Sequence, residues 1–527
     1  MRIRLDKSFT ATSILLVIAL MLLAVGYVPT AQAQQTPQAQ QTSQTQQAFD
    51  SAAIDRIMAD ALKHFDCPGA SIAIVKGGRL LYSKGYGVRS VNQPDPVTAD
   101  TVFAIGSTTK AFTAAVIGTL VDEGKMNWDD PVSKHLPGFK LSDPVANQTV
   151  SIRDLLSHRT GLIRHDQLWL STGWERDELI RRIGVVPVSY PIRTRFEYQN
   201  IMFLAAGMAA GNAAGTSWED LVQKQIFNPL GMTNATLTVT AALTGRDRAT
   251  PHTKRDNKHS VIPWRQIDNI APAGSINASA NDLSKWMLLN LQMGTVDGKR
   301  ILSPAAVREI QTPQMVVRLE GRWKIFFPES EVTQLSYGLG WFIASYRGLK
   351  VVGHGGTING FRAQIGLVPS AGIGVSVLAN LNGTQLPESV VYQVIDQLTG
   401  LEKRDWNAKI SDTAKQFQTD SEKAVEASMA RRVPNTRPSL DLSAYEGDYS
   451  DDGYGPITIS NGEGRLVLRW GKQSTPLDHF NYDTFFTGRA GGIPMELVQF
   501  TLGSDGQVTS LTVFGTRFTR IRKNPRM

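Results

Sequence analysis

The 527-residue sequence contains a single cysteine, Cys67. One thiol excludes an intramolecular disulfide, so the fold must be held by a hydrophobic core, which a chain of this length can supply. Cys67 stands in a polar turn over residues 66–69, which predicts an incidental thiol and not a catalytic one. Charged residues make up 19% of the chain, aromatic residues 8% and hydrophobic residues 42%. These fractions are ordinary for a globular protein and exclude a disordered, collagen-like or coiled-coil chain. At roughly 100–200 residues per domain, the length predicts more than one domain.

Motifs of several enzyme and binding classes are also missing. The sequence has no Gly-x-Ser-x-Gly, no His-Glu-x-x-His and no Walker loop, and its eight histidines show no metal-ligand spacing. The α/β-hydrolase, zinc-hydrolase and P-loop classes therefore lose their main support, and no metal or organic cofactor is implied. The net charge of +8 is mild for this length, and no DNA- or RNA-binding motif occurs. We therefore expect no nucleic-acid partner.

Only one stretch is long and apolar enough to be considered for a membrane, and it lies at the N-terminus. Residues 1–33 begin with a basic segment, continue with an apolar run over 14–28 and end in a small-x-small motif at Ala33. This order predicts a signal peptide that is cleaved after Ala33. An uncleaved anchor is the alternative, although the run is shorter than the ~20 residues of a spanning helix. We expect an exported protein, periplasmic or secreted, with no integral membrane segment after cleavage.

The rest of the chain divides by composition. Residues 34–48 are polar and Gln-rich, which predicts a flexible spacer. Residues 49–401 show a strand hairpin near their start, mostly helix and loop in the middle, and strand patterns again towards their end. This order predicts an α+β domain whose sheet combines both ends of the domain. Residues 402–437 are charged and predict a partly helical linker, and residues 438–527 have short alternating strands that predict a small all-β barrel or sandwich.

The first candidate for chemistry is the only Ser-x-x-Lys of the sequence, Ser107 to Lys110. If Ser107 starts the apolar helix expected over residues 111–120, Lys110 lies one turn on and on the same face, within reach of the hydroxyl. Burial would lower the pKa of the amine and allow it to act as a base. A bare Ser-x-x-Lys is more often a surface helix start, but the apolar flanks on both sides favour burial here.

Two further elements follow along the chain. Tyr198 and Asn200 form the only Tyr-x-Asn, in which a phenol can relay a proton and an amide can orient a lysine. A half-buried tyrosine beside a turn-forming asparagine is the alternative. The third element, His354-Gly355-Gly356-Thr357, follows a short apolar strand, and its glycines permit close approach of a ligand backbone. A plain glycine turn is the alternative there.

In this order, the three elements resemble the serine β-lactamase and penicillin-binding protein superfamily. The similarity is closest to its branch of class C β-lactamases, D-Ala-D-Ala carboxypeptidases, D-aminopeptidases and esterases, and it covers residues of about 50–400. Further phrases resemble the same branch, at 155–162, 227–232, 272–275 and 337–341. The resemblance implies an antiparallel sheet flanked by helices. Residues 441–527 are similar to the lipocalin-like β domain that often follows such domains.

The resemblance implies acyl transfer through a serine ester. Ser107 would be the nucleophile, Lys110 and Tyr198 would exchange its proton, and the backbone N–H groups of Ser107 and Thr357 would form the oxyanion hole. Asn200 would orient Lys110 and the substrate. His354, Gly355 and Gly356 would contact the substrate.

One departure from the pattern affects the expected substrate. The β-lactamases of this branch carry Lys-Thr-Gly at the third element, where this sequence has His354-Gly355-Gly356. A histidine supplies at most a pH-dependent charge for a β-lactam carboxylate. The expected function is therefore a serine hydrolase of D-amino-acid-containing peptides, which could be cell-wall derived, or of small esters. A β-lactamase and a non-catalytic peptide or β-lactam binding module are the alternatives, and the oligomeric state is left open.

Overall fold

The computed structural model describes residues 49–488 and 495–521. The predicted signal peptide (1–33) and spacer (34–48) lie outside these residues. Within the described part, no helix combines the length and the hydrophobicity that a bilayer crossing needs.

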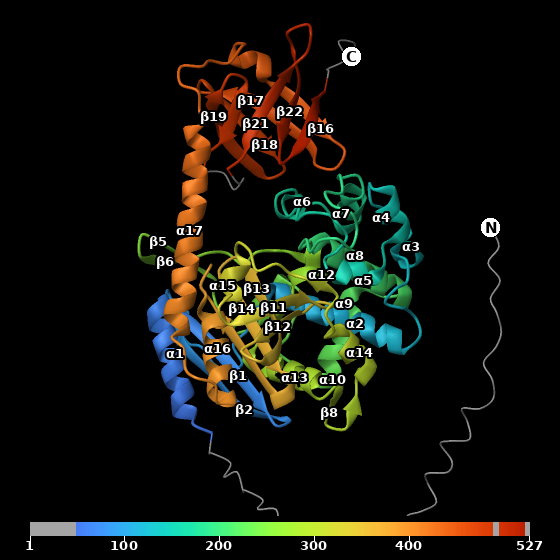
Figure 1. Cartoon of the computed structure of the whole chain (residues 1–527), viewed down its shortest axis with the longest axis vertical. Coiled ribbons are helices and arrows are strands. Elements are labelled where there is room, and N and C mark those ends of the chain that lie inside the picture. Colours follow the sequence, from blue (N-terminus) through green and yellow to red (C-terminus); the bar gives the residue numbers. More distant parts are fainter. Residues whose placement is uncertain (1–48, 489–494, 522–527) are drawn as a thin grey trace, which may run out of the picture. The chain divides into compact units, whose positions relative to one another are not determined.

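A nine-stranded sheet forms the centre of the first domain, in the order β10-β11-β12-β13-β14-β15-β1-β2-β3 (Figure 1). All the paired strands are antiparallel, and β1 from the start of the domain pairs with β15 from its end. This confirms the predicted α+β fold with one sheet built from both ends. The strands are β1 (Gly69–Lys76), β2 (Arg79–Ser90), β3 (Gln93–Pro96), β10 (Met315–Val316), β11 (Val332–Tyr337), β12 (Phe342–Tyr346), β13 (Leu349–Ile358), β14 (Phe361–Val368) and β15 (Ile373–Ala379).

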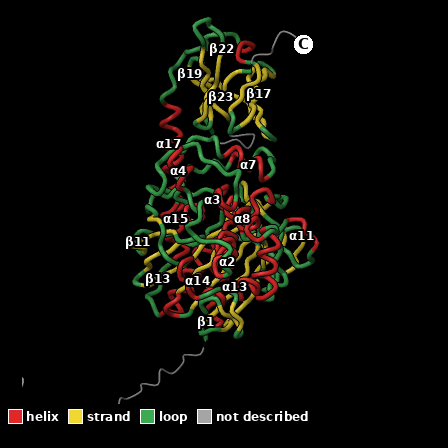
Figure 2. The backbone as a smooth tube through the Cα atoms, turned by 90° about the vertical axis from the view of Figure 1, so that its right-hand side faces the viewer, coloured by secondary structure: helices red, strands yellow, loops and turns green. Residues whose placement is uncertain are grey.

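Helices cover both faces of this sheet, so its central strands are buried on both sides and are apolar almost throughout. On one face, α13 packs against β1 and β15, and α2, α8 and α14 lie beside one another (Figure 2). On the other face, α16 packs against β14 and β15, and α1 packs against α16. These helices are α1 (Ser51–Phe65), α2 (Thr109–Asp122), α8 (Asn200–Ala214), α13 (Ala280–Leu291), α14 (Pro304–Ile310) and α16 (Leu386–Thr399).

Shorter elements connect this framework. The short helices are α3 (Val132–His135), α4 (Pro144–Thr149), α5 (Ile152–Leu156), α6 (Gln167–Leu170), α7 (Arg176–Ile183), α9 (Trp218–Val222), α10 (Asn228–Leu230), α11 (Val239–Thr244), α12 (Ala271–Gly274) and α15 (Trp323–Phe326). Three two-stranded ribbons pair β4 (Phe103–Ala104) with β7 (Asn277–Ala278), β5 (His252–Arg255) with β6 (Lys258–Val261), and β8 (Thr295–Val296) with β9 (Lys299–Arg300).

Two helices, α2 and α8, are buried all round. Every residue of α2 from Thr109 to Leu120 is buried, and so is nearly all of α8 up to Gly211. A helix that is hydrophobic on every side belongs in the interior of a protein. The two helices pack against each other, and the candidate residues Lys110 and Asn200 lie in their first turns. The interior of the domain therefore fixes the positions of both polar side chains.

The long helix α17 (Trp406–Ala430) follows the first domain and precedes the all-β part. Only its residues Trp406, Asn407 and Ile410 are buried, all within its first two turns. The strands that follow, β16 to β23, close into an eight-stranded barrel filled with aromatic side chains such as Tyr449 and Trp470. This confirms the predicted all-β barrel. The strands are β16 (Gly447–Asp451), β17 (Gly455–Gly462), β18 (Arg465–Trp470), β19 (Gln473–Asn481), β20 (Thr484–Thr487), β21 (Leu497–Leu502), β22 (Val508–Val513) and β23 (Thr516–Arg520).

Candidate active site

Ser107 lies in a 3₁₀ turn, η1 (Gly106–Thr108), that leads directly into α2. Gly106 has a φ of +53°, a conformation that glycine adopts without strain. Lys110 follows in the first turn of the helix, and its Nζ is 3.1 Å from Ser107 Oγ. The structure thus brings together the hydroxyl and the amine of the Ser-x-x-Lys motif.

The Lys110 amine is fully buried and faces three oxygen atoms. Besides Ser107 Oγ, these are Asn200 Oδ1 at 2.7 Å and the carbonyl oxygen of Ala273 at 2.8 Å. Burial, with the nearby Arg164 guanidinium, holds the pKa of Lys110 well below its ordinary value of 10.5. A neutral amine can donate its two N–H groups to the amide and carbonyl oxygens, which leaves its lone pair towards the Ser107 hydroxyl. This is the arrangement that a general base requires.

Asn200 begins helix α8, and its amide is held at both ends. Its Oδ1 accepts from Lys110, and its Nδ2 donates to Asp166 Oδ1 over 2.9 Å. Asp166 also accepts from the Trp169 indole N–H at 2.9 Å and pairs with Arg164. Because a carboxylate only accepts, Asp166 fixes the amide with its oxygen towards the lysine.

Tyr198 lies over the other side of the lysine. The Lys110 Nζ is 4.8 Å and the Arg164 Cζ 5.1 Å from the centre of its ring. Burial raises the pKa of Tyr198 to about 12, although a hydrogen bond with Ser107 and the nearby Arg164 and Arg322 act in the opposite direction. The phenol is therefore protonated at neutral pH and can serve as a proton donor next to Ser107.

The segment that carries Tyr198 is fixed by a buried histidine. The His158 ring lies 4.2 Å from the Tyr198 ring, centre to centre, and its Nδ1 accepts from the Gln199 N–H over 3.1 Å. Burial lowers the pKa of His158 well below 6.5, so the ring is neutral and Nδ1 is free to accept. This side chain, within the phrase at 155–162, therefore supports the Tyr-x-Asn element.

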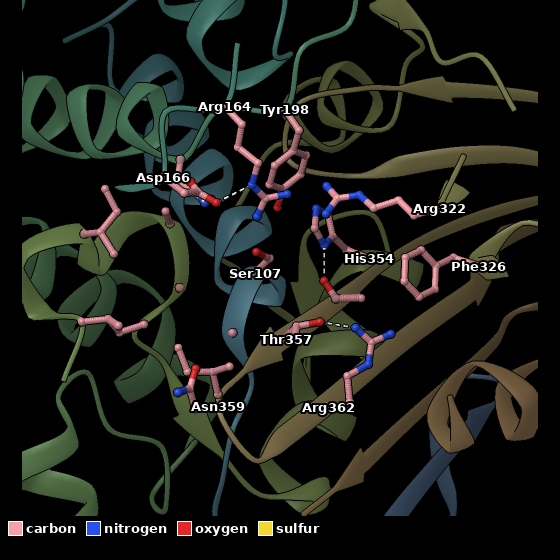
Figure 3. Close-up of a pocket in the computed structure, with 18 of the residues that line it drawn as sticks. Ser107, Arg164, Asp166, Tyr198, Arg322, Phe326, His354, Thr357, Asn359 and Arg362 are labelled. Carbon is pink, nitrogen blue, oxygen red and sulfur yellow. Dashed lines mark hydrogen bonds and ion pairs between the residues drawn. The ribbon is translucent and has the colours of Figure 1, made fainter. Parts of the chain in front are cut away.

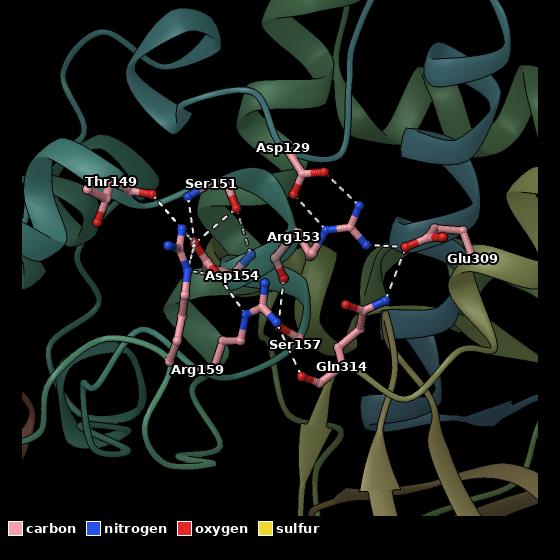
Figure 4. A network of polar contacts seen from close by, with 10 residues as sticks. Asp129, Thr149, Ser151, Arg153, Asp154, Ser157, Arg159, Glu309 and Gln314 are labelled. Atoms are coloured by element: carbon pink, nitrogen blue, oxygen red, sulfur yellow. Dashed lines mark hydrogen bonds and ion pairs between the residues drawn. The ribbon is translucent and has the colours of Figure 1, made fainter. Parts of the chain in front are cut away.

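A polar network anchors the chain that leads to His158 (Figure 4). The Asp154 carboxylate is buried and accepts from Arg159 Nε at 2.6 Å and from Arg193 Nη2 at 2.7 Å. Ser151 and Asp154 also form a capping box at the start of α5. Burial alone would raise the pKa of Asp154, but hydrogen bonds with Arg193, the Ser151 backbone and Arg159 lower it below its usual range. The network ties this loop to α5 as a unit.

Glycines allow the backbone of β13, which carries the third element, to pack closely against the turn that carries Ser107. A Cβ at Gly356 would lie 1.7 Å from the Ile105 carbonyl oxygen, so only glycine lets β13 pack against the serine turn. A Cβ at Gly106 would lie 2.8 Å from the Thr357 nitrogen. The Thr357 nitrogen is therefore next to the turn that presents Ser107, the position expected for a two-donor oxyanion hole.

His354 lines the same pocket, but both of its ring nitrogens are occupied. Nε2 is 2.9 Å from the Tyr337 hydroxyl, and Nδ1 is 2.7 Å from the Gly355 carbonyl oxygen. Burial raises the pKa of Tyr337 well above 10, so its phenol donates and Nε2 accepts. Burial also lowers the pKa of His354 to about 3. His354 is therefore a neutral ring at physiological pH and contributes no charge to the pocket.

These elements surround a pocket of about 300 Å³, which is the size of a small-ligand site (Figure 3). Its lining includes Ser107, Tyr198, Asn200, His354 and Thr357. Across residues 49–488 and 495–521, no group of three histidine, cysteine, aspartate or glutamate side chains could hold a metal ion.

Several pocket residues were not found from the sequence, above all Arg164, Asp166 and Arg322. Arg164 and Asp166 lie just after the phrase at 155–162, and two opposite charges next to a family-like phrase were the available signal. Arg322 precedes the four-residue helix α15 in a segment without a clear period, and no local pattern marks it.

Comparison with known proteins identifies the family. The family model described as Beta-lactamase matches residues 54–398. The chain belongs to this family. The β-lactamase family comprises serine hydrolases of this fold, so the predicted resemblance and fold class are confirmed. Residues 431–524 match a second model, described as a domain of unknown function (DUF3471).

Individual relatives span most of the chain. The unguisins hydrolase ungD of Aspergillus violaceofuscus is 30% identical over 447 residues, which cover 78% of this chain and 77% of that protein. Protein flp of Staphylococcus aureus is 27% identical over 354 residues, covering 64% and 65%.

Solved structures share the fold at lower identity. The octameric penicillin-binding protein homologue from Pyrococcus abyssi aligns with a TM-score of 0.59 at 23% identity, over 90% of this chain and all of that one. A class C β-lactamase from Rhodobacter sphaeroides aligns with a TM-score of 0.54 at 22% identity, over 66% of this chain and all of that one.

Proposed function

We propose that this β-lactamase-family protein is an exported serine hydrolase that forms an acyl-enzyme on Ser107. Its substrates are D-amino-acid-containing peptides, of carboxypeptidase or aminopeptidase type, or small esters. The observation that supports this most is the Lys110 amine, which is buried, depressed in pKa and bonded to Ser107, Asn200 and Ala273.

In the first half-reaction, Ser107 Oγ attacks the substrate carbonyl carbon while its proton passes to Lys110 Nζ. The carbonyl oxygen becomes an oxyanion and accepts from the backbone N–H groups of Ser107 and Thr357. The intermediate then collapses: the bond to the leaving nitrogen or oxygen breaks, and Tyr198 donates its phenolic proton to that atom. Lys110 returns its proton to Tyr198, so the acyl-enzyme is left with both groups in their starting states.

In the second half-reaction, water takes the place of the leaving group. Lys110, through Tyr198, accepts a proton from the water as the oxygen bonds to the acyl carbon. Collapse then breaks the bond to Ser107 Oγ, which recovers the proton. One water is consumed, and the products are an acid and an amine or alcohol.

The neutral His354 argues against efficient β-lactam turnover. A β-lactam carries a carboxylate, and the third element offers it no permanent positive charge. The relation to the unguisins hydrolase agrees with a hydrolytic activity. Export is proposed from the N-terminal segment of the sequence alone.

Intact-mass spectrometry of the mature chain tests the proposal, with the Ser107→Ala variant as control. We expect a fluorophosphonate adduct on the parent protein and none on the variant, and a penicilloyl adduct that persists for minutes. Rapid release of the penicilloyl group would indicate a β-lactamase. A parent protein that reacts with neither reagent would contradict the hydrolase and favour a binding module.

A further inference from the structure

One edge of strand β13 is open along the pocket. β12 pairs with β13 only as far as Gly353, and no other strand of the described residues pairs with that edge from His354 to Ile358. An extended substrate can pair with such an edge, and its successive side chains then point to opposite faces of the sheet. A substrate held along β13 would therefore contact the protein on both faces.

Successive residues of β13 face different parts of the pocket. The His354 ring is 6.3 Å from the Tyr198 ring, centre to centre, on the face that carries the catalytic groups. Gly355 faces the other way, because a Cβ there would lie 2.6 Å from Gln364 Oε1 and 3.6 Å from Glu388 Oε1. Gln364 and Glu388 line the same pocket as the catalytic serine. The pocket thus continues past the edge of β13 to the face that α16 covers.

We call this part of the pocket the α16-side compartment. Two aromatic side chains and three polar ones define it: Phe326, Phe327, Arg362, Gln364 and Glu388. The Arg362 guanidinium lies over the Phe326 ring, with its Cζ 5.0 Å from the ring centre (Figure 3). Arg362 comes from β14 and Glu388 from the first turn of α16, and the two form an ion pair. The compartment therefore combines apolar rings with one pair of opposite charges.

This ion pair leaves hydrogen-bonding capacity unused. The side chains of Glu388 and Arg362 are only 2% and 8% exposed. Arg362 donates to Glu388 Oε1 and to Thr357 Oγ1. Within residues 49–488 and 495–521, Glu388 Oε2 and Arg362 Nε have no hydrogen-bond partner. A buried acceptor without a donor is unfavourable, so the compartment favours an occupant that supplies one.

The two unused atoms indicate the chemistry of that occupant. A hydroxyl group is neutral, can donate to Glu388 Oε2 and can accept from Arg362 Nε. A cationic group would be repelled by Arg362, and an anionic group by Glu388. The aromatic side chains suit the apolar part of the occupant. The compartment therefore fits an apolar side chain that ends in a hydroxyl group.

The compartment lies on the leaving-group side of the bond that is cleaved. The Phe326 ring is 6.4 Å from the Trp323 ring, which in turn is 6.2 Å from the Tyr198 ring, centre to centre. Tyr198 is the acid that protonates the leaving atom. Gly355 precedes the oxyanion residue Thr357 by two positions along β13, next to the residue that faces Tyr198. A side chain over Gly355 therefore belongs to the half of the substrate that departs.

We propose that the α16-side compartment is a specificity subsite that binds a hydroxyl-bearing side chain on the leaving group, with Glu388 Oε2 as the acceptor. In a peptide substrate this is the side chain of the residue that is released. The inference rests on the proposed hydrolase and narrows its substrates to those with a hydroxylated leaving group.

Two pairs of esters test this, because in each pair a methyl group replaces the hydroxyl. On the leaving group, 3-(hydroxymethyl)phenyl acetate is compared with 3-ethylphenyl acetate. On the acyl group, phenyl 3-hydroxypropanoate is compared with phenyl butanoate. We expect kcat/KM to favour the hydroxylated leaving group by about tenfold, since the methyl analogue leaves the acceptor unpaired, and the acyl pair to differ by less than about threefold.

The variants Glu388→Met and Arg362→Met/Glu388→Met should reduce the leaving-group ratio to below about twofold. The double variant replaces the buried pair by apolar groups and avoids an unpaired buried arginine, so it remains informative where the single variant does not fold. Both esters of a pair are measured on the same preparation, so their ratio does not depend on the folded fraction. Asp396→Asn is the matched control: Asp396 is a buried carboxylate of the same helix α16, it pairs with Arg347, and in the described chain neither of these two residues lines the pocket. It should keep the tenfold ratio.

Other outcomes overturn the subsite or the hydrolase separately. A parent ratio below about threefold, a tenfold ratio that survives in the double variant, an equal preference in the acyl pair, or a lost ratio in Asp396→Asn would overturn the subsite. Hydrolysis of 3-ethylphenyl acetate by Ser107→Ala at the parent rate would instead overturn the proposed hydrolase.

Discussion

The two sides of the pocket are built in different ways. The side beneath Ser107 consists of Lys110 and Asn200, which lie in the first turns of two wholly buried helices. Arg322, which also lines the pocket, lies instead on an irregular segment directly before the four-residue helix α15. The chemical groups are thus held by the core, whereas this charge lies on the kind of segment that can vary without disturbing the core.

The largest effect is expected on the buried side, from Lys110→Arg. This change keeps a positive charge but removes the lone pair, because a guanidinium does not lose its proton in this pH range. If the amine acts as a base, kcat should fall by roughly 10²–10⁴. Stopped-flow acylation by a fluorophosphonate would measure this step. Retention of more than a tenth of the parent rate would show that the lysine acts only through its charge.

The second-largest effect on kcat is expected from a change at the contact between β13 and η1, the turn that carries Ser107. In Gly356→Ala the new methyl group meets the Ile105 carbonyl, so the strand must move away from η1 and take the Thr357 N–H with it. Loss of one oxyanion donor costs about 10²–10³ in kcat. Gly138→Ala is the matched control, because a Cβ there meets nothing within 4 Å. Steady-state ester hydrolysis measures kcat for both variants. Equal kcat values for Gly356→Ala and Gly138→Ala would contradict the proposed role of the Thr357 N–H group.

Asp166 holds the Asn200 amide, and its removal should have a smaller effect with a distinct signature. Its charge raises the pKa of Lys110, so Asp166→Asn should lower that pKa further and shift the acidic limb of the kcat/KM profile to lower pH. It should also free the Asn200 amide to rotate and cost about tenfold in rate. The exposed Asp420→Asn serves as control. A fall in rate at all pH values without a shifted limb would assign Asp166 a purely structural role.

The smallest expected effect concerns His354. This residue belongs to the third element, but it is buried, as Lys110 and Asn200 are. Burial lowers its pKa to about 3, so the ring is neutral at physiological pH. In ¹⁵N-histidine NMR spectra, its ring signals should not titrate between pH 8 and 5, with His354→Gln used for assignment. Titration near pH 6.5 would contradict the neutral state of the ring and show that His354 can supply a positive charge to the pocket.

The sequence was sufficient for the fold class and for the residues that meet by local spacing. Ser107 and Lys110 are three residues apart across η1 and the first turn of α2, so helix geometry places this pair, whereas Tyr198 precedes α8 and Asn200 is its first residue. The contact between these two motifs, and the neutrality of His354, depend on tertiary structure. Asn200 contacts Lys110 across 90 residues of sequence, and Tyr337 contacts His354 across 17. Local pattern carries no information on such long-range contacts.

Cys67 illustrates the same limit. The sequence places it in a polar turn and predicts an incidental thiol, whereas the structure buries it next to the first strand of the sheet. Burial raises the pKa of the thiol to about 12, which makes it unreactive. The expected inertness agrees with the structure, but its cause is burial, which the neighbouring residues did not reveal.

The ends of the central sheet have a consequence for self-association. One edge strand, β3, contains Pro94 and Pro96, which have no N–H to donate, and all four of its residues are exposed. The other edge strand, β10, has only two residues, Met315 and Val316. Neither β3 nor β10 presents a continuous row of hydrogen-bond donors to which another chain could add a strand. These two outermost strands of the sheet that positions the pocket therefore oppose edge-to-edge pairing by their own composition and length.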